Sequence, residues 1–354
     1  MKTITVKASK TYDMIIGEGL LGDAGYFIRK TVGGHSAVIV SDDIVAELYA
    51  KNLTDTLAEN GYRTAQYIFT HGEASKKAGT FLSLVNFLAE EKLTRTDSVV
   101  ALGGGITGDI AGFAAACYMR GVKFIQVPTT LLSAVDSSVG GKTGVNLSAG
   151  KNLLGAFYQP DLVLCDISLM STLPKSVFRD GCAEVIKYGI ATDRELFESL
   201  KTPVSNQLET VISRCVEIKR AIVAEDEFET GRRRLLNLGH TVGHAIELLS
   251  GYDISHGCAV AAGMAFASRT AVRMGILSPR CLTDILNMLC LYDLPVNTPY
   301  EADEIVHACL YDKKRDGENI TMVFPSGSEI GSSILKEIPA RQFESLIRMG
   351  LEEL

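Results

Sequence analysis

The chain has 354 residues, 46% of them hydrophobic, and a formal net charge of −7 at pH 7. This length exceeds that of a typical single domain, so two domains with sizeable cores are predicted. The negative charge argues against nucleic acid as the main partner, because phosphate backbones are bound by basic surfaces. No run reaches the roughly 18 apolar residues of a membrane span, and the first residues lack the apolar core of a secretory signal.

The eight cysteines are spread along the chain and form no C-x-x-C pair. Most of them lie among apolar or helical residues. We therefore expect reduced thiols in a cytoplasmic protein, and neither a disulfide framework nor a zinc knuckle.

Strand and helix patterns alternate in the first half of the chain. Alternating or short apolar runs predict strands at residues 2–8, 12–17, 37–40, 64–69, 98–102 and 123–127. Helical periodicity predicts helices at residues 44–59, 75–91 and 106–117. This order predicts an α/β domain with a parallel, Rossmann-like sheet, whose ligands bind at the carboxyl ends of the strands.

Helical periodicity dominates after about residue 175. Amphipathic helices are predicted at residues 175–190, 205–225, 235–249, 257–274 and 278–290. We therefore predict an α/β domain over residues 1–174 and a mostly α-helical domain over residues 175–354. We expect the active site in the cleft between them, because pockets commonly form between domains.

A glycine-rich turn joins the strand at 98–102 to the helix that follows. Gly103, Gly105 and Gly108 satisfy the pattern G-x-G-x-x-G. Glycines let the backbone approach a pyrophosphate, and a helix N-terminus favours its negative charge, so the turn indicates a dinucleotide site. A structural tight turn is the alternative. No acidic residue follows about twenty positions later, so Asp42 at the end of an earlier strand is the candidate for binding the ribose.

A second strand-to-helix turn runs from His71 to Lys76. Glu73 could accept hydrogen bonds from ribose hydroxyls, and Lys76 could meet a phosphate. Taken alone, such a turn is more often an ordinary solvated one.

The segment between Val127 and Gly144 contains Gly-Lys-Thr and resembles a P-loop at first sight. A P-loop needs a glycine five residues before its Gly-Lys pair, and Asp136 occupies that position, so a nucleotide triphosphatase is rejected. Asp136, Lys142, Lys151 and Asn152 lie with several hydroxyls in this glycine-rich region. Such a set suits a small anionic or polyhydroxylated substrate.

Three of the six histidines, His240, His244 and His256, fall within seventeen residues. His240 and His244 are four apart in the helix predicted at 235–249, so their imidazoles share a face and can bind a divalent cation. Thr241 stands where H-E-x-x-H requires glutamate, which argues against a zinc protease.

Glu184 and Lys187 are three apart on an apolar helix and share a face, with a surface ion pair as the alternative. Glu184 is the best carboxylate to complete a metal site with two histidines. A Glu/His/His set leaves coordination positions open for substrate, as catalytic zinc sites do. Gly239 and Gly243 leave space beside the histidines for a ligand or for a closely packed neighbour.

Ten short segments together carry the pattern of a known family. They occur in the family's order between about Asp42 and Pro325, at residues 103–113, 118–121, 127–131, 135–143, 150–153, 155–160, 183–187, 237–247, 256–257 and 312–314. On these segments the chain resembles 3-dehydroquinate synthase, a family of sugar-phosphate cyclases.

The resemblance implies a homodimeric cytosolic lyase of the shikimate pathway, which leads to chorismate and the aromatic amino acids. Its substrate would be 3-deoxy-D-arabino-heptulosonate 7-phosphate, and its products 3-dehydroquinate and phosphate. It implies NAD, regenerated within each turnover, and one divalent metal, zinc or cobalt. The implied steps are oxidation, phosphate elimination, reduction, ring opening and intramolecular aldol closure. The substrate's own phosphate is expected to take the proton in the elimination.

The resemblance also implies roles for individual residues. The metal ligands would be Glu184, His240 and His256, so that His244 would meet the substrate near the reacting centre. NAD contacts are implied for Asp42, His71, Gly72, Glu73, Ala74, Ser75, Lys76, Gly105, Ile106, Thr107, Gly108, Asp109, Thr129, Thr130, Lys142, Lys151, Leu169, Met170, Ser171 and Thr172. Substrate contacts are implied for Asp136, Lys142, Asn152, Lys187, Lys219, Arg233, Asn237 and one of Lys313 and Lys314. Arg120 would reach the site of the partner subunit.

Two other enzyme functions are alternative interpretations of the same residues. A related sugar-phosphate cyclase would share the metal and NAD sites, but its substrate lacks the carboxylate that Lys219, Arg233 and Asn237 would bind. A metal-dependent polyol dehydrogenase would accumulate NADH and would not need the lysine-rich cluster. A metal-binding structural protein would leave that cluster without a purpose.

Overall fold

The computed structural model describes residues 1–313 and 319–352 and divides the chain into two compact units. The first unit consists of Met1–Pro174 and Lys219–Phe228, and the second of Lys175–Ile218 and Glu229–Leu354. The first change of unit therefore falls after Pro174. The sequence prediction did not separate Lys219–Phe228 from the rest of the second domain.

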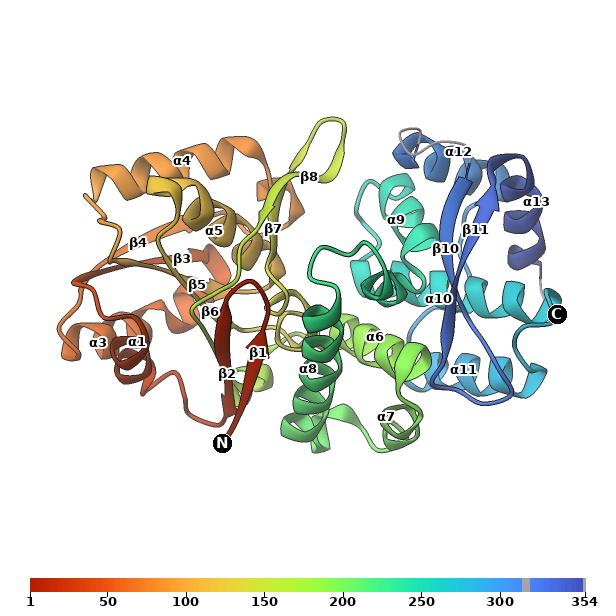
Figure 1. Ribbon diagram of the computed structural model, residues 1–354, viewed down its shortest axis with the longest axis horizontal. Helices are drawn as coiled ribbons and strands as arrows, with labels where there is room; N and C mark the ends of the chain where they lie inside the picture. Colours follow the sequence, from red (N-terminus) through yellow and green to blue (C-terminus); the bar gives the residue numbers. More distant parts are fainter. Residues whose placement is uncertain (314–318, 353–354) are drawn as a thin grey trace. The chain divides into compact units, whose positions relative to one another are not determined.

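The first unit contains a seven-stranded sheet in the order β1-β2-β9-β6-β5-β3-β4 (Figure 1). Its strands are β1 (Lys2–Lys7), β2 (Thr11–Gly17), β3 (Ser36–Asp42), β4 (Arg63–Phe69), β5 (Ser98–Gly103), β6 (Lys123–Pro128) and β9 (Leu162–Asp166). Only β1 pairs antiparallel with its neighbour within this sheet, so the predicted parallel, Rossmann-like α/β fold is confirmed.

Helices cover both faces of this sheet. They are α1 (Ala24–Val32), α2 (Asp43–Val45), α3 (Lys51–Glu59), α4 (Ala78–Glu90) and α5 (Gly105–Cys117), with short helical segments η1 (Ala46–Ala50), η2 (Glu73–Ser75), η3 (Tyr118–Arg120), η4 (Ser133–Ser137) and η5 (Ile167–Thr172). The predicted helices at 44–59, 75–91 and 106–117 correspond to α2 through α3, α4 and α5. Helix α1 and strand β9 were not predicted.

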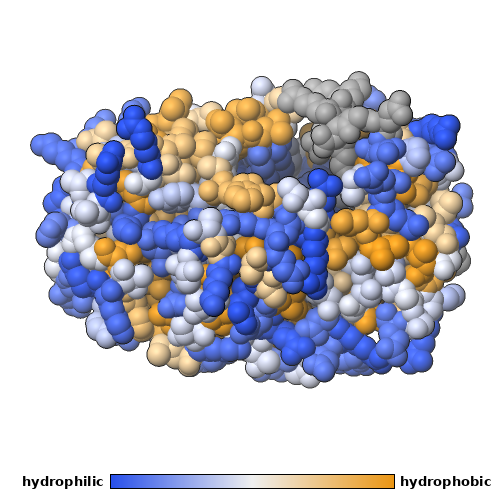
Figure 2. All heavy atoms as spheres, in the orientation of Figure 1, coloured by the Kyte–Doolittle hydropathy of each residue, from blue (hydrophilic) through white to orange (hydrophobic). Residues whose placement is uncertain are grey.

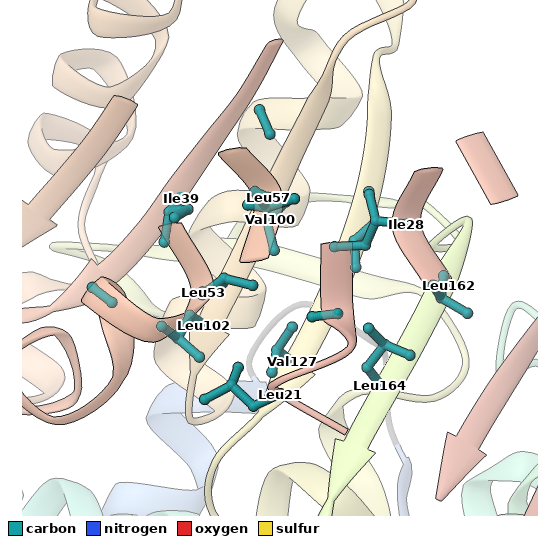
Figure 3. Close-up of a cluster of buried hydrophobic side chains, with 14 of the residues drawn as sticks. Leu21, Ile28, Ile39, Leu53, Leu57, Val100, Leu102, Val127, Leu162 and Leu164 are labelled. Atoms are coloured by element: carbon teal, nitrogen blue, oxygen red, sulfur yellow. The ribbon is translucent and has the colours of Figure 1, made fainter. Parts of the chain in front are cut away.

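The core is divided by the sheet because successive residues of a strand face opposite sides. Ile39 and Val100 pack with α1 and α3 on one side, whereas Val38 and Val99 pack with α4 and α5 on the other. Figure 3 shows the first of these clusters, with Leu21, Ile28, Ile39, Leu53, Leu57, Val100, Leu102, Val127, Leu162 and Leu164 labelled.

A hairpin of β7 (Lys142–Leu147) and β8 (Gly150–Phe157) belongs to the first unit and extends away from the large sheet (Figure 1). The sequence analysis predicted no strands in this glycine-rich region, and glycine is unfavourable in strands. Gly144 and Gly155 lie directly opposite each other, and a Cβ on Gly144 would be 2.7 Å from the carbonyl oxygen of Leu154. The glycines therefore allow a closer approach of the two strands than side chains would permit.

The second unit is mainly helical. Its elements are α6 (Lys175–Thr192), α7 (Arg194–Ser199), η6 (Val204–Asn206), the first part of α8 (Leu208–Glu225), η7 (Arg232–Asn237), α9 (His240–Leu249), α10 (His256–Arg273), α11 (Pro279–Leu291), α12 (Ala302–Lys313), β10 (Asn319–Pro325), β11 (Ser333–Pro339) and α13 (Ala340–Leu351). Helix α10 is buried from Gly257 to Ala271 and packs against α6, α9, α11 and α13. A helix that is apolar on all sides is stable only in such a core position.

The predicted helix at 235–249 is wrong in its first turn. Helix α9 begins at His240, whereas Arg232–Asn237 forms a separate 3₁₀ segment. Gly239 has a φ of 81°, a left-handed conformation that an α-helix cannot continue through. The hairpin β10–β11 and helix α7 were not predicted either.

Polar and apolar residues are mixed on the surface. On the face drawn in Figure 2, hydrophilic and hydrophobic residues are interspersed, which is normal because apolar atoms contribute much of any folded protein's surface. Among the described residues, no helix is both long enough and apolar enough to cross a membrane.

Candidate active site

Three side chains of the second unit form a candidate metal centre. Glu184 comes from α6, His240 is the first residue of α9, and His256 is the first residue of α10. Their ligand atoms all lie within 4.8 Å of one another. The Nε2 atoms of His256 and His240 are 3.3 Å and 3.7 Å from Oε1 of Glu184. The structure thus brings together the three residues that the resemblance implies as ligands.

The other nitrogen of each imidazole is held by a second group. Nδ1 of His240 lies 3.2 Å from the carbonyl oxygen of Leu238, to which it can only donate. Nδ1 of His256 lies 3.3 Å from Oε2 of the buried Glu247. These contacts leave both Nε2 atoms directed at Glu184, which is how outer-shell acceptors orient metal-binding histidines. The donor set therefore fits a divalent cation such as zinc or cobalt.

A second combination, His244, Glu247 and His256, also has its ligand atoms within 4.8 Å. His244 is exposed, and its ring centroid lies 5.3 Å from that of His240 and 6.2 Å from that of His256. Glu184, by contrast, is completely buried together with Lys187, with which it forms an ion pair. Both sets contain a buried carboxylate, but the second set also needs the exposed His244, so the more enclosed set of Glu184, His240 and His256 is the better cation site.

The surroundings shift the pKa values of the two histidines in opposite directions. Burial, followed by the Lys187 ammonium, lowers the pKa of His240 to about 3. Burial also lowers the pKa of His256, but hydrogen bonds and charge from Glu184 and Glu247 outweigh it and raise the pKa to about 10. His240 is therefore neutral at pH 7. A cation that binds at Nε2 of His256 takes the place of a proton.

Glycines bring the two histidine-bearing helices close together. A Cβ on Gly239 would be 2.6 Å from the carbonyl oxygen of Val260, and one on Gly243 would be 3.1 Å from that of Ala259. A Cβ on Gly263 would overlap the carbonyl oxygen of Gly239. The space beside the histidines is thus taken by a closely packed neighbour, helix α10.

The glycine-rich turn of the first unit runs from β5 into α5. A Cβ on Gly103 would overlap the side chain of Thr107, and one on Gly108 would be 2.8 Å from Oε1 of Gln126. These two glycines have packing reasons, as the structural alternative supposed. Gly105 is half-buried at the first position of α5, where helix N–H groups favour an anion.

Five of the predicted site residues meet around Lys76. Its Nζ lies 2.5 Å from Oδ2 of Asp109 and donates to Oδ1 of Asn152 over 2.6 Å. Lys151 lies 3.6 Å from Oε1 of Glu73. The turn after β4, the start of α5 and the hairpin β7–β8 are therefore joined by charge-assisted contacts.

Another ion pair of the first unit joins Lys219 and Asp136. Lys219 lies in the part of α8 that belongs to the first unit, and its Nζ donates to both the carboxylate and the backbone oxygen of Asp136, the latter over 2.7 Å. Lys219 is buried, and its pairing with a carboxylate offsets part of the cost of burying a charge.

Other predicted residues have mainly structural contacts. Asp42 accepts from the backbone N–H of Val45 and caps α2, and His71 is exposed with Nδ1 2.9 Å from Oδ1 of Asp43. Leu169 belongs to the core cluster of Figure 3, and Thr172 donates to the carbonyl oxygen of Leu169.

The remaining predicted substrate residues differ widely in exposure. Arg233 is buried, Lys142 and Arg120 are exposed, and Asn237 donates to Oε1 of Glu229 over 2.6 Å. Lys314 lies outside the described residues, as does the side chain of Lys313.

Glu247 and Asn146 are among the residues in contact with the candidate site that sequence reasoning missed. Glu247 holds His256, and its position seven residues after His240, two turns along one helix, is a signal that could have found it. Asn146 contacts Glu73 and Asn152, but no spacing in the sequence points to it.

The fold and these side chains point to a class: an α/β enzyme with a dinucleotide-type turn and a candidate Glu/His/His metal centre. Two family models match the chain, 3-dehydroquinate synthase N-terminal over residues 66–180 and 3-dehydroquinate synthase C-terminal over residues 181–315. The chain belongs to the 3-dehydroquinate synthase family, which confirms the resemblance carried by its motifs.

Curated relatives share this family over nearly their whole length. The 3-dehydroquinate synthase of Streptococcus sanguinis (strain SK36) is 41% identical over 345 residues, which cover 95% of this chain and 97% of that protein. The one from Aliivibrio fischeri (strain MJ11) is 43% identical over 364 residues, covering 100% and 99%. The predicted function as a 3-dehydroquinate synthase is thereby confirmed.

Solved structures of related cyclases have the same fold. A 2-deoxy-scyllo-inosose synthase complexed with carbaglucose-6-phosphate, NAD⁺ and Co²⁺ has a TM-score of 0.88 and 29% identity, covering 99% of this chain and 100% of that one. The 2-epi-5-epi-valiolone synthase of Streptomyces hygroscopicus subsp. jinggangensis 5008, with NAD⁺ and Zn²⁺ bound, has a TM-score of 0.86 and 28% identity, with 98% of each chain covered. A butanol dehydrogenase from Thermotoga maritima, at 16% identity and a TM-score of 0.68, shares the fold alone.

Proposed function

We propose that this chain converts 3-deoxy-D-arabino-heptulosonate 7-phosphate into 3-dehydroquinate and phosphate. The observation that carries the proposal is the cluster of the buried Glu184 with the half-buried His240 and His256 in a chain that is 41–43% identical to curated 3-dehydroquinate synthases. The cofactors are NAD and one divalent metal, as in the two cyclase structures with NAD⁺ and Co²⁺ or Zn²⁺.

Each cofactor supplies one kind of chemistry when bound. Bound NAD would supply hydride-transfer chemistry. Glu184, His240 and His256 would hold the metal, which would supply Lewis-acid chemistry towards substrate oxygens. The protein's own task is then to bind and orient the substrate and to stabilise the charge that develops on it.

The cationic side chains suit the two anionic groups of this substrate. Arg233 offers a planar fork that matches a carboxylate, and the ammonium groups of Lys187 and Lys219 suit phosphate or carboxylate oxygens. All three side chains are buried, so their attraction for an anion is stronger than it would be in water. We infer that Asn237 and His244 complete the substrate contacts and that the substrate's phosphate takes the proton in elimination.

For NAD, we propose that the glycine-rich turn holds the pyrophosphate through Gly105 to Asp109. Glu73, Lys76, Lys151 and Asp42 would contact the nucleotide beside it. The half-buried Gly105 at the first position of α5 supports this assignment. Residues 1–174 are thus proposed as the NAD-binding domain, and residues 175–354 as the metal- and substrate-binding domain.

We also propose that the enzyme is a cytoplasmic homodimer in which Arg120 reaches the partner's site. The exposure of Arg120, whose φ of 64° turns the backbone out of the helical conformation, supports this role. The proposed metal is zinc or cobalt, because a Glu/His/His set accepts both.

The decisive experiment measures phosphate release from 3-deoxy-D-arabino-heptulosonate 7-phosphate with substoichiometric NAD, before and after chelation. The expected result is one phosphate per substrate, no net NADH and loss of activity with chelator. Release only from a phosphorylated sugar without a carboxylate would point to another cyclase. Accumulation of NADH on polyols would point to a dehydrogenase.

Arg233→Ala tests the carboxylate contact. The Michaelis constant for the carboxylated substrate should rise roughly 10- to 100-fold, because a hydrogen bond between charged groups contributes about 1.5–3 kcal/mol. The dissociation constant of NAD should not change. The neighbouring exposed Arg232→Ala is the matched control. An equal effect of both substitutions would refute the assignment.

A further inference from the structure

The end of the hairpin β7–β8 is attached to the turn that follows β4. Asn146 is left out of the regular pairing by a register shift between Val145 and Leu147. It pairs instead with Lys77 in a parallel bridge, and its backbone N–H donates to the carbonyl oxygen of Lys76 over 2.8 Å. The bulge therefore places Asn146 against the segment that contains Glu73 and Lys76.

Both ends of the Asn146 amide are used there. Nδ2 donates to Oε1 of Glu73 over 2.7 Å, and Oδ1 accepts from the backbone N–H of Asn152 over 2.9 Å. Among side chains of this size, only an amide supplies one donor and one acceptor from the same planar group.

The contact with Asn152 secures an unusual backbone conformation. Asn152 has a φ of 55°, in the left-handed region that residues other than glycine rarely adopt. Its Oδ1 accepts from Lys76, which also pairs with Asp109. Asn146 and Lys76 thus hold Asn152 from its backbone and its side chain.

We propose that Asn146 is a positioning residue that couples the NAD site to the substrate site. It acts through Glu73, assigned to NAD, and through Asn152, assigned to the substrate, so this inference rests on the proposed function. Loss of the amide releases both partners at once, and ordering of Glu73 by the nucleotide is transmitted to Asn152 through one side chain.

Asn146→Ala tests this coupling. We expect the dissociation constant of NAD and the Michaelis constant of the substrate at saturating NAD each to rise roughly tenfold, the usual scale for losing a hydrogen bond to a charged group or an orienting partner. Thermal unfolding should shift little, because Asn146 itself belongs to neither core cluster of the first unit. The matched control is Asn52→Ala at an exposed position of α3, where both constants should stay at the wild-type values.

A charge swap separates positioning from a general structural role. Asn146→Asp keeps an acceptor for the N–H of Asn152 but places a carboxylate against that of Glu73. Adding Glu73→Gln supplies a donor again, with the direction of the hydrogen bond reversed. Because Glu73→Gln can itself weaken the binding of NAD, the quantity to compare is the Michaelis constant of the substrate, measured at saturating NAD. We expect the double variant to lie closer to wild type than Asn146→Asp alone.

The outcomes are distinct. Unchanged constants in Asn146→Ala, or no recovery in the double variant, overturn the coupling. A lowered melting temperature without a change in either constant leaves Asn146 with a structural role only and also overturns it. If the wild-type enzyme releases no phosphate from its proposed substrate, the proposed function fails. NAD binding to wild type and Asn146→Ala then still decides whether Asn146 positions Glu73.

Discussion

The two units arrange their candidate site residues by different physical means. In the first unit, side chains from separate helices and turns hold one another through ion pairs and hydrogen bonds, such as Lys76 with Asp109 and Lys219 with Asp136. In the second, Glu184, His240 and His256 are fixed by three helices that pack closely. Geometry is therefore encoded by polar partners in one unit and by backbone packing in the other.

The difference also concerns charge. Each buried lysine of the first unit has a carboxylate partner, so the loss of one member leaves the other unbalanced. In the second unit, the Glu184 carboxylate faces two imidazoles and the Lys187 ammonium. A divalent cation adds its charge to an arrangement whose shape is already set by the helices.

The largest expected effect comes from removing a proposed metal ligand. His240→Ala should abolish stoichiometric metal binding and reduce turnover on the order of a thousandfold, since Lewis-acid stabilisation is worth several kcal/mol. Metal content measured by atomic absorption, together with phosphate release, checks this result.

The neighbouring His244→Ala is its control for metal content. Full loss of metal in His244→Ala, with retention in His240→Ala, would show that the cation binds His244, Glu247 and His256 instead. The helices would then present a different set of ligands.

The next effect concerns the packing between α9 and α10. Gly263→Ala should destabilise the protein by roughly 3 kcal/mol and weaken metal binding, because its Cβ overlaps a backbone oxygen that cannot move away. Gly243→Ala, with its nearest backbone oxygen at 3.1 Å, should have a smaller effect in the same direction and serves if Gly263→Ala does not fold.

Gly79→Ala in α4 is the matched control. Nothing lies within 4 Å of its added Cβ, so it should be neutral or stabilising by about 0.5–1 kcal/mol. Urea unfolding and competition with a chelator measure the two quantities. Equal metal affinities across the series would contradict the view that packing sets the centre.

The same contrast explains how much the sequence could predict. Apolar strands such as β3 and β5 and the glycine turn between β5 and α5 were readable, because local period and turn chemistry specify them. The lysines and histidines of the site could also be named from the sequence, but their roles came from the resemblance to a known family. The structure adds the residues that contact them.

Features that depend on distant contacts were not readable. The hairpin β7–β8 needs Gly144 opposite Gly155, and the start of α9 at His240 depends on Gly239 in a left-handed conformation. The contact of Asn146 with Glu73 joins residues 73 positions apart. Local sequence patterns contain no information about such pairs, because the folded chain alone brings these residues together.

The smallest expected effect tests whether hydrogen bonding also orients the proposed metal ligands of the second unit. Glu247 accepts from Nδ1 of His256 and so directs its Nε2 toward Glu184. Glu247→Ala should weaken metal binding by up to about 100-fold and Glu247→Gln, which retains an acceptor oxygen, by about tenfold, the range found for outer-shell partners. Chelator competition measures both, with the exposed Glu90→Gln of α4 as control.

The graded order matters more than either value. If Glu247 only orients His256, glutamine must retain more affinity than alanine, and both must retain more than His240→Ala. If Glu247 were itself a ligand, Glu247→Ala would lose the metal as completely as His240→Ala does. A wild-type affinity in both Glu247 variants would instead mean that helix packing alone orients His256, and the contrast between the two units would be sharper than the hydrogen bonds suggest.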